Sequence, residues 1–299
     1  MNPFLKKITV FISLFYLAIF LSFTTSNCVI FKSVDFTLDP KINKIIIGNS
    51  QPQCAYNDSL INNFKNLAKS GETYFYNYYK LKALIRQNTQ LDTVFIEFSN
   101  TNILEREDQK IWETTYLNHF FPNYSYMLNL EDYYLLFLKN PVGFQKAIFK
   151  TIQENTSRIR KSNYNYKDSI GGYWHLKRQK VKAILDSTTH KTITNKKLST
   201  IKLSQYDLVY LEKIIKLCQN NNITPFLIRS PYHPKFQVDQ YELDYQKLLN
   251  ERFNTVTFFD FKKFSLEDHE YADLQHLNYK GAAKYSLYFN ELFSNNKKL

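Results

Sequence analysis

Short strand-like segments that alternate with helix-like segments constrain the fold of this chain most strongly. The strand-like segments cover residues 44–48, 64–68, 92–98, 224–230 and 255–260. The runs at 44–48 and 92–98 are mainly continuous in hydrophobicity, which is typical of strands buried on both faces. Alternation of such strands with helices predicts an α/β domain in which helices cover both faces of a parallel sheet.

The helix-like segments between these strands show apolar residues at three- and four-residue spacing. One helix is expected over 72–88, and another follows Ser204, a suitable N-cap residue. Further helices are expected at 52–62, near 240–252, and from about Asn278 to the end of the chain.

Residues 104–200 interrupt the alternation and are interpreted as a helical insertion or cap. Aromatic helical stretches lie near 126–139 and 142–158, and a polar, basic stretch follows at 160–200. The expected organisation is an N-terminal membrane anchor or signal, a stalk, the first half of the α/β domain, the insertion, and the second half of the domain. The corresponding ranges are 1–30, 31–43, 44–103, 104–200 and 201–299.

An uncharged, apolar run follows Lys6 and Lys7 and continues from residue 8 to about residue 30. Its length suffices to cross a bilayer, which takes about 20 residues. The preceding lysines predict a cytoplasmic N-terminus and place the bulk of the chain on the extracytoplasmic, periplasmic side. An uncleaved single-pass anchor is the first interpretation. A cleaved signal peptide that yields a secreted protein, or a lipid anchor on Cys28, is the alternative.

The net charge of +12 is spread along the chain, and no nucleic-acid-binding motif accompanies it. It is therefore interpreted mostly as solvated surface, with an anionic glycan or membrane face as the next possibility. Cys54 and Cys218 are interpreted as small buried hydrophobic residues, with a disulfide between them as the alternative. No metal-binding or nucleotide-binding motif is present, so we expect neither a metal nor a cofactor.

Two motifs carry the chemistry. Gly48-Asn49-Ser50 follows the first predicted strand, and Asp273-Leu274-Gln275-His276 lies near the end of the chain. A hydroxyl, an imidazole that takes its proton, and a carboxylate that orients the imidazole are the components of serine acyl transfer. Ser50, Gly71 and Asn100 each come just after a predicted strand, where sites gather in parallel sheets.

These motifs resemble those of the SGNH (GDSL-like) hydrolase superfamily over residues 40–103 and 201–299. The resemblance implies a flavodoxin-like α/β/α sandwich with Ser50, His276 and Asp273 as the catalytic residues. It also implies an oxyanion site formed by the Gly71 backbone and the Asn100 side chain, with Asn102 as the alternative. Asn49 replaces the usual Asp of Gly-Asp-Ser, and the family's Gly-x-Asn-Asp is absent.

The ending Asp273-x-x-His276-Leu277-Asn278-x-x-Gly281 is similar to membrane-anchored, extracytoplasmic branches that acylate cell-envelope polymers. The resemblance thus implies a serine esterase or O-acyltransferase acting on an acylated envelope or secreted glycan. His233 and Trp174 are candidate substrate contacts. A catalytically inactive, SGNH-like glycan-binding or assembly factor is the alternative, and a basic, membrane-tethered interaction protein is a third. Nucleic acid is not an expected partner.

Overall fold

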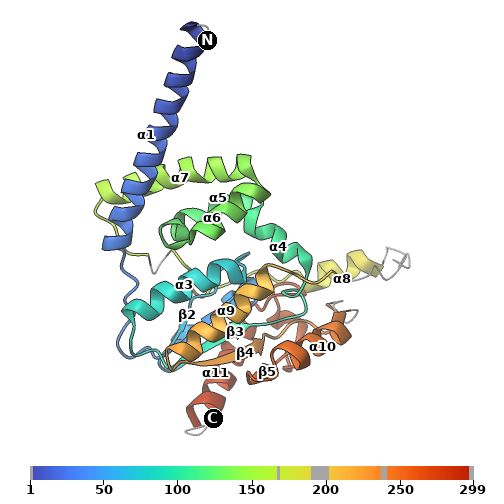
Figure 1. Cartoon of the computed structure of the whole chain (residues 1–299). Helices are drawn as coiled ribbons and strands as arrows, with labels where there is room; N and C mark the ends of the chain where they lie inside the picture. The colour runs from blue at the N-terminus through green and yellow to red at the C-terminus, as the bar shows by residue number, and fades with distance from the viewer. Residues whose placement is uncertain (1–2, 167–168, 190–201, 237–240, 296–299) are drawn as a thin grey trace. The chain divides into compact units, whose positions relative to one another are not determined.

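The structure is a computed structural model that describes residues 3–166, 169–189, 202–236 and 241–295 (Figure 1). The chain divides into two compact units. We call Met1–Phe36 with Ile111–Ser169 the helical unit, and Thr37–Lys110 with Ile170–Leu299 the sheet unit. Residues 190–200 of the expected insertion lie outside the described residues.

The sheet unit is built on five parallel strands in the order β2-β1-β3-β4-β5. This is the flavodoxin-like order, so the predicted fold class is confirmed. The strands are β1 (Lys44–Ile47), β2 (Phe64–Asn66), β3 (Thr93–Glu97), β4 (Thr224–Arg229) and β5 (Phe258–Asp260).

Helices cover both faces of this sheet. On one face α3 packs against α9, and on the other α11 packs against α2 (Figure 1). The helical segments of this unit are α2 (Ser50–Ala55), η1 (Asp58–Leu60), α3 (Tyr74–Gln87), α8 (Val181–Thr189), α9 (Asp207–Asn220), α10 (Glu242–Arg252), η4 (Asp268–Glu270) and α11 (Tyr279–Asn295), and α4 (Glu105–Trp112) crosses into the helical unit.

Aromatic side chains fill the core between the sheet and α11. The ring centroid of Phe95 of β3 lies 5.4 Å from that of Phe226 of β4 and 5.2 Å from that of Phe289 of α11. Val94 and Ile96 are also buried, and the two-residue period of a strand turns them toward the opposite face. Burial on both faces explains why the predicted strands read as continuous apolar runs.

The helical unit consists of α1 (Pro3–Ser33), α5 (Thr114–Tyr124), η2 (Ser125–Met127), α6 (Leu130–Lys139) and α7 (Pro141–Arg160). Phe23 of α1 packs against Phe121 with ring centroids 6.2 Å apart. Asn27 of α1 is buried, and its Oδ1 accepts hydrogen bonds from Asn155 (2.9 Å) and Ser125 (3.0 Å). The C-terminal third of α1 is therefore part of the core of this unit.

The segment expected to be a stalk is packed rather than free at its centre. Val34 and Phe36 are buried, and the main chain of Asp35 bonds with Tyr164 and Tyr166. Apolar side chains at alternate positions bury one side of this segment, which a solvated stalk would not do. The stretch 170–180, expected in the insertion, belongs to the sheet unit.

Glu97 at the end of β3 is fully buried, and this predicts a pH dependence of stability. Burial raises its pKa from 4.5 to about 8, although the hydrogen bonds that Ser230 donates to its carboxyl group lower the pKa. Between these two pH values Glu97 is ionised in the unfolded chain but still protonated in the folded protein. Its contribution to the free energy of unfolding is therefore fully present below about pH 4.5 and is lost as pH rises through about 8. We expect Glu97→Gln to weaken the fall in urea midpoint between pH 5 and 8.

Asp207 keeps some pH dependence in that variant, because burial raises its pKa to about 8 as well. The Glu97→Gln curve should therefore be shallower than that of the wild type but not flat. An unchanged slope would show that Glu97 is ionised in the folded protein throughout this range.

Candidate active site

A tight turn between β1 and α2 positions Ser50. Gly48 has φ +147°, and a Cβ there would lie 2.6 Å from the Cβ of Glu97, so only glycine fits. Asn49 is the N-cap of α2, and its Oδ1 accepts a hydrogen bond from the N–H of Gln51 at 3.0 Å. An amide oxygen performs this capping as a carboxylate does, so Asn49 retains the local structure. Ser50 is the first residue of α2.

The loop that carries Asp273 and His276 is fixed by its own backbone. Asp273 Oδ1 accepts hydrogen bonds from the N–H groups of Gln275 (2.9 Å) and His276 (3.1 Å). Just after the loop, buried Asn278 donates to the carbonyl of His269 (2.7 Å) and accepts from the N–H of Lys280 (2.9 Å). Asn278 therefore joins the loop to the start of α11.

Gly281 allows α11 to approach the chain that precedes this loop. A Cβ at this position would lie 2.2 Å from the carbonyl oxygen of Glu270. The residues after the Asp-x-x-His motif therefore have a structural role: Asn278 caps the helix, and Gly281 lets it pack closely.

The structure brings Ser50, His276 and Asp273 into one hydrogen-bonded chain. Ser50 Oγ lies 2.8 Å from His276 Nε2, and His276 Nδ1 lies 2.8 Å from Asp273 Oδ1. Burial alone would raise the pKa of Asp273, but its hydrogen bonds with His276, Gln275 and Arg178 outweigh burial and lower it to about 2. An ionised Asp273 accepts the Nδ1 proton of His276, which leaves Nε2 free to accept the proton of Ser50.

Arg178 is a further member of this group that the sequence did not reveal. Its Nη2 donates to Asp273 Oδ2 at 2.6 Å. The segment that carries it runs from α2 to the Asp273 loop, with Trp174 N–H bound to Gln53 (2.8 Å) and Lys180 N–H bound to Ala272 (2.9 Å). In the sequence Arg178 belongs to a short basic cluster, and nothing in that pattern pairs it with a carboxylate about a hundred residues away.

For the acyl-transfer chemistry proposed below, we expect Arg178→Gln to lower kcat roughly five- to tenfold with little change in KM, because it removes one charge-assisted hydrogen bond from Asp273 at a partly exposed position. Steady-state kinetics on an activated ester would measure both parameters. Lys177→Gln removes the same charge from the neighbouring residue and should leave kcat unchanged. A rise in KM alone would assign Arg178 to substrate binding instead.

Gly71 lies in a turn that contacts the helix of Ser50. It has φ +76° at the third position of a turn in which Glu72 N–H donates to the carbonyl of Lys69 at 3.0 Å. The N–H of Ser70 donates to Gln53 Oε1 of α2 at 2.8 Å. The turn is thereby held against the helix that begins at Ser50.

The structure separates the two asparagines that follow β3. Asn100 is buried, accepts from Arg229 Nη1 (2.8 Å) and donates to Glu242 Oε2 (2.9 Å). These bonds place Asn100 in a buried charged network and engage its Oδ1 and one of its two amide hydrogens, and its oxyanion role stays a prediction. The sequence could not show this, because both partners lie more than a hundred residues away.

Asn102 is instead connected to α2, the helix that begins at Ser50. Its Oδ1 accepts from the Ser99 hydroxyl (2.7 Å), which also lies 3.0 Å from Gln51 Oε1, next to Ser50. Within the described ranges its Nδ2 makes no hydrogen bond, so this amide group remains able to donate.

The two predicted substrate contacts differ in exposure. His233 is 3% exposed, its Nδ1 accepts from Lys235 N–H (3.1 Å), and its Nε2 lies 2.9 Å from Asp268. With both ring nitrogens engaged, His233 fixes its loop and does not present a free group to substrate. Trp174 is 44% exposed beside α2 and remains available for contact.

Comparisons with known proteins give limited matches. No curated protein matches the chain. One family model, which carries no descriptive name, matches residues 176–298, less than half of the chain. Among solved structures, a GDSL-like lipase from Bacteroides thetaiotaomicron VPI-5482 matches at 10% sequence identity with a TM-score of 0.38, covering 91% of this chain and 98% of that chain.

Proposed function

We propose that the protein is a serine-dependent esterase or O-acyltransferase. The observation that carries this proposal is the hydrogen-bonded chain Ser50–His276–Asp273, assembled from residues more than two hundred positions apart. It lies beyond the carboxyl end of β1, where parallel α/β sheets place their sites. A serine, an imidazole and a carboxylate in this order form the apparatus of acyl transfer.

In the proposed reaction, His276 Nε2 accepts the proton of Ser50 as the hydroxyl oxygen attacks an ester carbonyl. The ester C–O bond then breaks, His276 returns the proton to the departing alcohol, and the acyl group stays on Ser50. A second acceptor then gives its proton to His276 and attacks the acyl carbonyl, the bond between the acyl group and Ser50 Oγ breaks, and His276 returns the proton to Ser50. Water as acceptor gives hydrolysis, and a sugar hydroxyl gives transfer. Asp273 orients the imidazole and stabilises its protonated form.

The proposed oxyanion donors are the backbone N–H groups of Ser50 and Gly71 and the side-chain amide of Asn102. We expect Asn102→Asp to lower kcat by about a hundredfold, because it replaces a donor by a negatively charged acceptor. The substitution keeps the oxygen that Ser99 uses, so folding should be preserved and is checked by circular dichroism. A variant with wild-type kcat would remove Asn102 from the oxyanion site.

A glycan is the proposed substrate because of two features of the chain. The indole of Trp174 is exposed in the segment beside α2, and an aromatic face of this kind packs well against a sugar ring. The net charge of +12 favours association with an acidic envelope polymer.

We further propose that α1 is an uncleaved anchor, with Lys6 and Lys7 in the cytoplasm and the two units on the other side. It is the one helix in the described part of the chain long and apolar enough to cross a membrane. Phe23 and Asn27 of α1 are core residues of the helical unit, and cleavage of a signal peptide after them would leave that core incomplete.

The test uses the full-length chain in detergent micelles or nanodiscs. The proposal predicts turnover of an activated acetyl ester and covalent labelling of Ser50 by a serine-directed phosphonate, located by mass spectrometry. Ser50→Ala should abolish both while its circular dichroism spectrum stays unchanged. Adding an oligosaccharide acceptor and measuring its mass distinguishes transfer from hydrolysis. A folded protein that shows neither turnover nor labelling would favour a non-catalytic binding or assembly role.

A further inference from the structure

Helix α6 exposes an apolar face. Leu130, Tyr134, Phe137 and Leu138 recur at i, i+4, i+7 and i+8, and their exposed fractions are 85%, 64%, 49% and 56%. The buried residues of the same helix are Asp132 and Leu136. A helix on the surface of a water-soluble unit normally shows the opposite pattern, with its apolar stripe turned inward.

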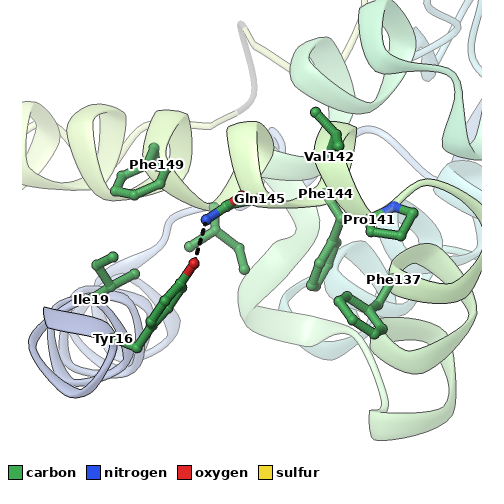
Figure 2. A pocket seen from close by; sticks show the side chains of 9 residues that line it. Tyr16, Ile19, Phe137, Pro141, Val142, Phe144, Gln145 and Phe149 are labelled. Carbon is green, nitrogen blue, oxygen red and sulfur yellow. Dashed lines mark hydrogen bonds between the residues drawn. The ribbon is translucent and has the colours of Figure 1, made fainter. Parts of the chain in front are cut away.

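The apolar surface continues onto α7 and α1. Val142 and Phe149 of α7 are 64% and 43% exposed. With Phe137 they line an apolar pocket whose other wall is formed by Tyr16 and Ile19 of α1 (Figure 2). Tyr16 Oη accepts a hydrogen bond from Gln145 of α7 at 3.3 Å.

A second apolar pocket lies further along α1, where Phe20 and Phe31 face Leu130, Tyr133 and Phe144 of α6 and α7. The apolar face of α6 and α7 is thus continuous with the surface of the hydrophobic helix. Contiguous exposed apolar surface of this kind marks an interaction site.

The length of α1 indicates what covers this surface. The apolar part of α1 that precedes its first buried residue, Phe23, covers residues 8–22 and spans about 22 Å at 1.5 Å per residue, which is less than the ~30 Å hydrocarbon core of a bilayer. A full span of about 20 residues extends to residue 27. It therefore includes Tyr16, Ile19 and Phe23, the residues at which α1 meets α6 and α7.

We propose that α6 and the first half of α7 are embedded in the leaflet of the phospholipid bilayer at the C-terminal end of α1. The two apolar pockets beside α1 would hold lipid acyl chains. Figure 1 shows α7 crossing α1, as expected of a helix that lies along the membrane surface. Lys146 lies on α7 beside this face, and its long side chain can reach the lipid phosphates.

The test measures lipid exposure in the full-length protein, reconstituted in phosphatidylcholine–phosphatidylglycerol vesicles. Nitroxide labels are attached to Leu130→Cys and Leu138→Cys in a Cys28→Ser background. The buried Cys54 and Cys218 should not react, because burial raises the pKa of each thiol to about 12. Collision rates with O2 and with a water-soluble nickel chelate report lipid and water exposure.

Two control labels bracket the measurement. Leu14→Cys on α1 is the reference for lipid, and Leu243→Cys on α10 has the same 85% exposure as Leu130 but lies in the sheet unit. The proposal predicts that the labels at 130 and 138 favour O2 over the nickel chelate severalfold, as the label at 14 does, whereas the label at 243 shows the reverse.

Labels at 130 and 138 that behave like the label at 243 would overturn the proposal. Labels shielded from both reagents would also overturn it, because they would indicate a protein partner or a second copy on this face. Water exposure of the label at 14 would overturn it as well, since the proposal requires α1 in the bilayer.

Discussion

Replacing His276 by alanine should lower kcat on an activated ester by about four orders of magnitude or more. The imidazole is the only described group bonded to both Ser50 and Asp273, so its loss removes the proton acceptor and separates the carboxylate from the reaction. Stopped-time assays and phosphonate labelling rates measure the effect, and circular dichroism verifies that the variant is folded.

Two further variants make this test specific. The double variant Ser50→Ala, His276→Ala should be no less active than Ser50→Ala alone, because residues that act as one unit lose their effect together. His119→Ala, which removes an exposed histidine of the helical unit, should retain wild-type activity. If His276→Ala retains more than a few per cent of wild-type activity while Ser50→Ala is inactive, another group is the base.

Replacing Lys80 by methionine should reduce the free energy of unfolding at pH 7 by about 3–5 kcal/mol. Lys80 and Glu72 are both buried and form an ion pair, and Lys80 Nζ also donates to the carbonyl of Leu67 at 2.6 Å. Burial lowers the pKa of Lys80 to about 8, although Glu72 raises it. Without Lys80, the carboxylate of Glu72 stays buried without this counter-charge.

The double variant Glu72→Gln, Lys80→Met should recover much of this loss, because neither charge is then buried. Urea unfolding of the wild type, the two single variants and the double variant gives the coupling energy directly. Equal destabilisation in Lys80→Met and in the double variant would mean that the loss comes from packing and not from the ion pair. Since Gly71 precedes Glu72, Lys80→Met should also disturb the turn that contacts the helix of Ser50.

The sheet and the group Ser50, Asp273 and His276 can be predicted from the sequence because each strand and each of the two motifs is encoded locally. Apolar runs and turn residues fix each strand, and the Gly-Asn-Ser and Asp-x-x-His motifs each lie within a few positions. The contacts of Arg178, Asn100 and His233 depend instead on partners in other elements. Asn100 and Asn102 sit in the same local pattern, and only the tertiary position of Arg229 and Glu242 distinguishes them.

The packing of residues 31–38 also has no local signal in the sequence. A short mixture of polar and apolar residues after a hydrophobic helix has no distinctive period, so the sequence predicts a stalk there. Its burial depends on Tyr164 and Tyr166, which follow α7 far along the chain. The stretch 170–180 is likewise held in the sheet unit by main-chain hydrogen bonds, and such bonds leave no pattern in the sequence.

The participation of Phe23 and Asn27 in the helical core has a consequence for where the protein can act. A fragment that starts at residue 32 would leave Phe121 without its stacked ring and Asn155 without its acceptor. Proteolytic shedding should therefore yield a damaged protein and not a diffusible one. With α1 as the proposed membrane anchor, the proposed polymer substrate would have to come to the lipid surface. The local density of the protein in the membrane, more than its concentration in solution, would then set the rate at which the polymer is modified.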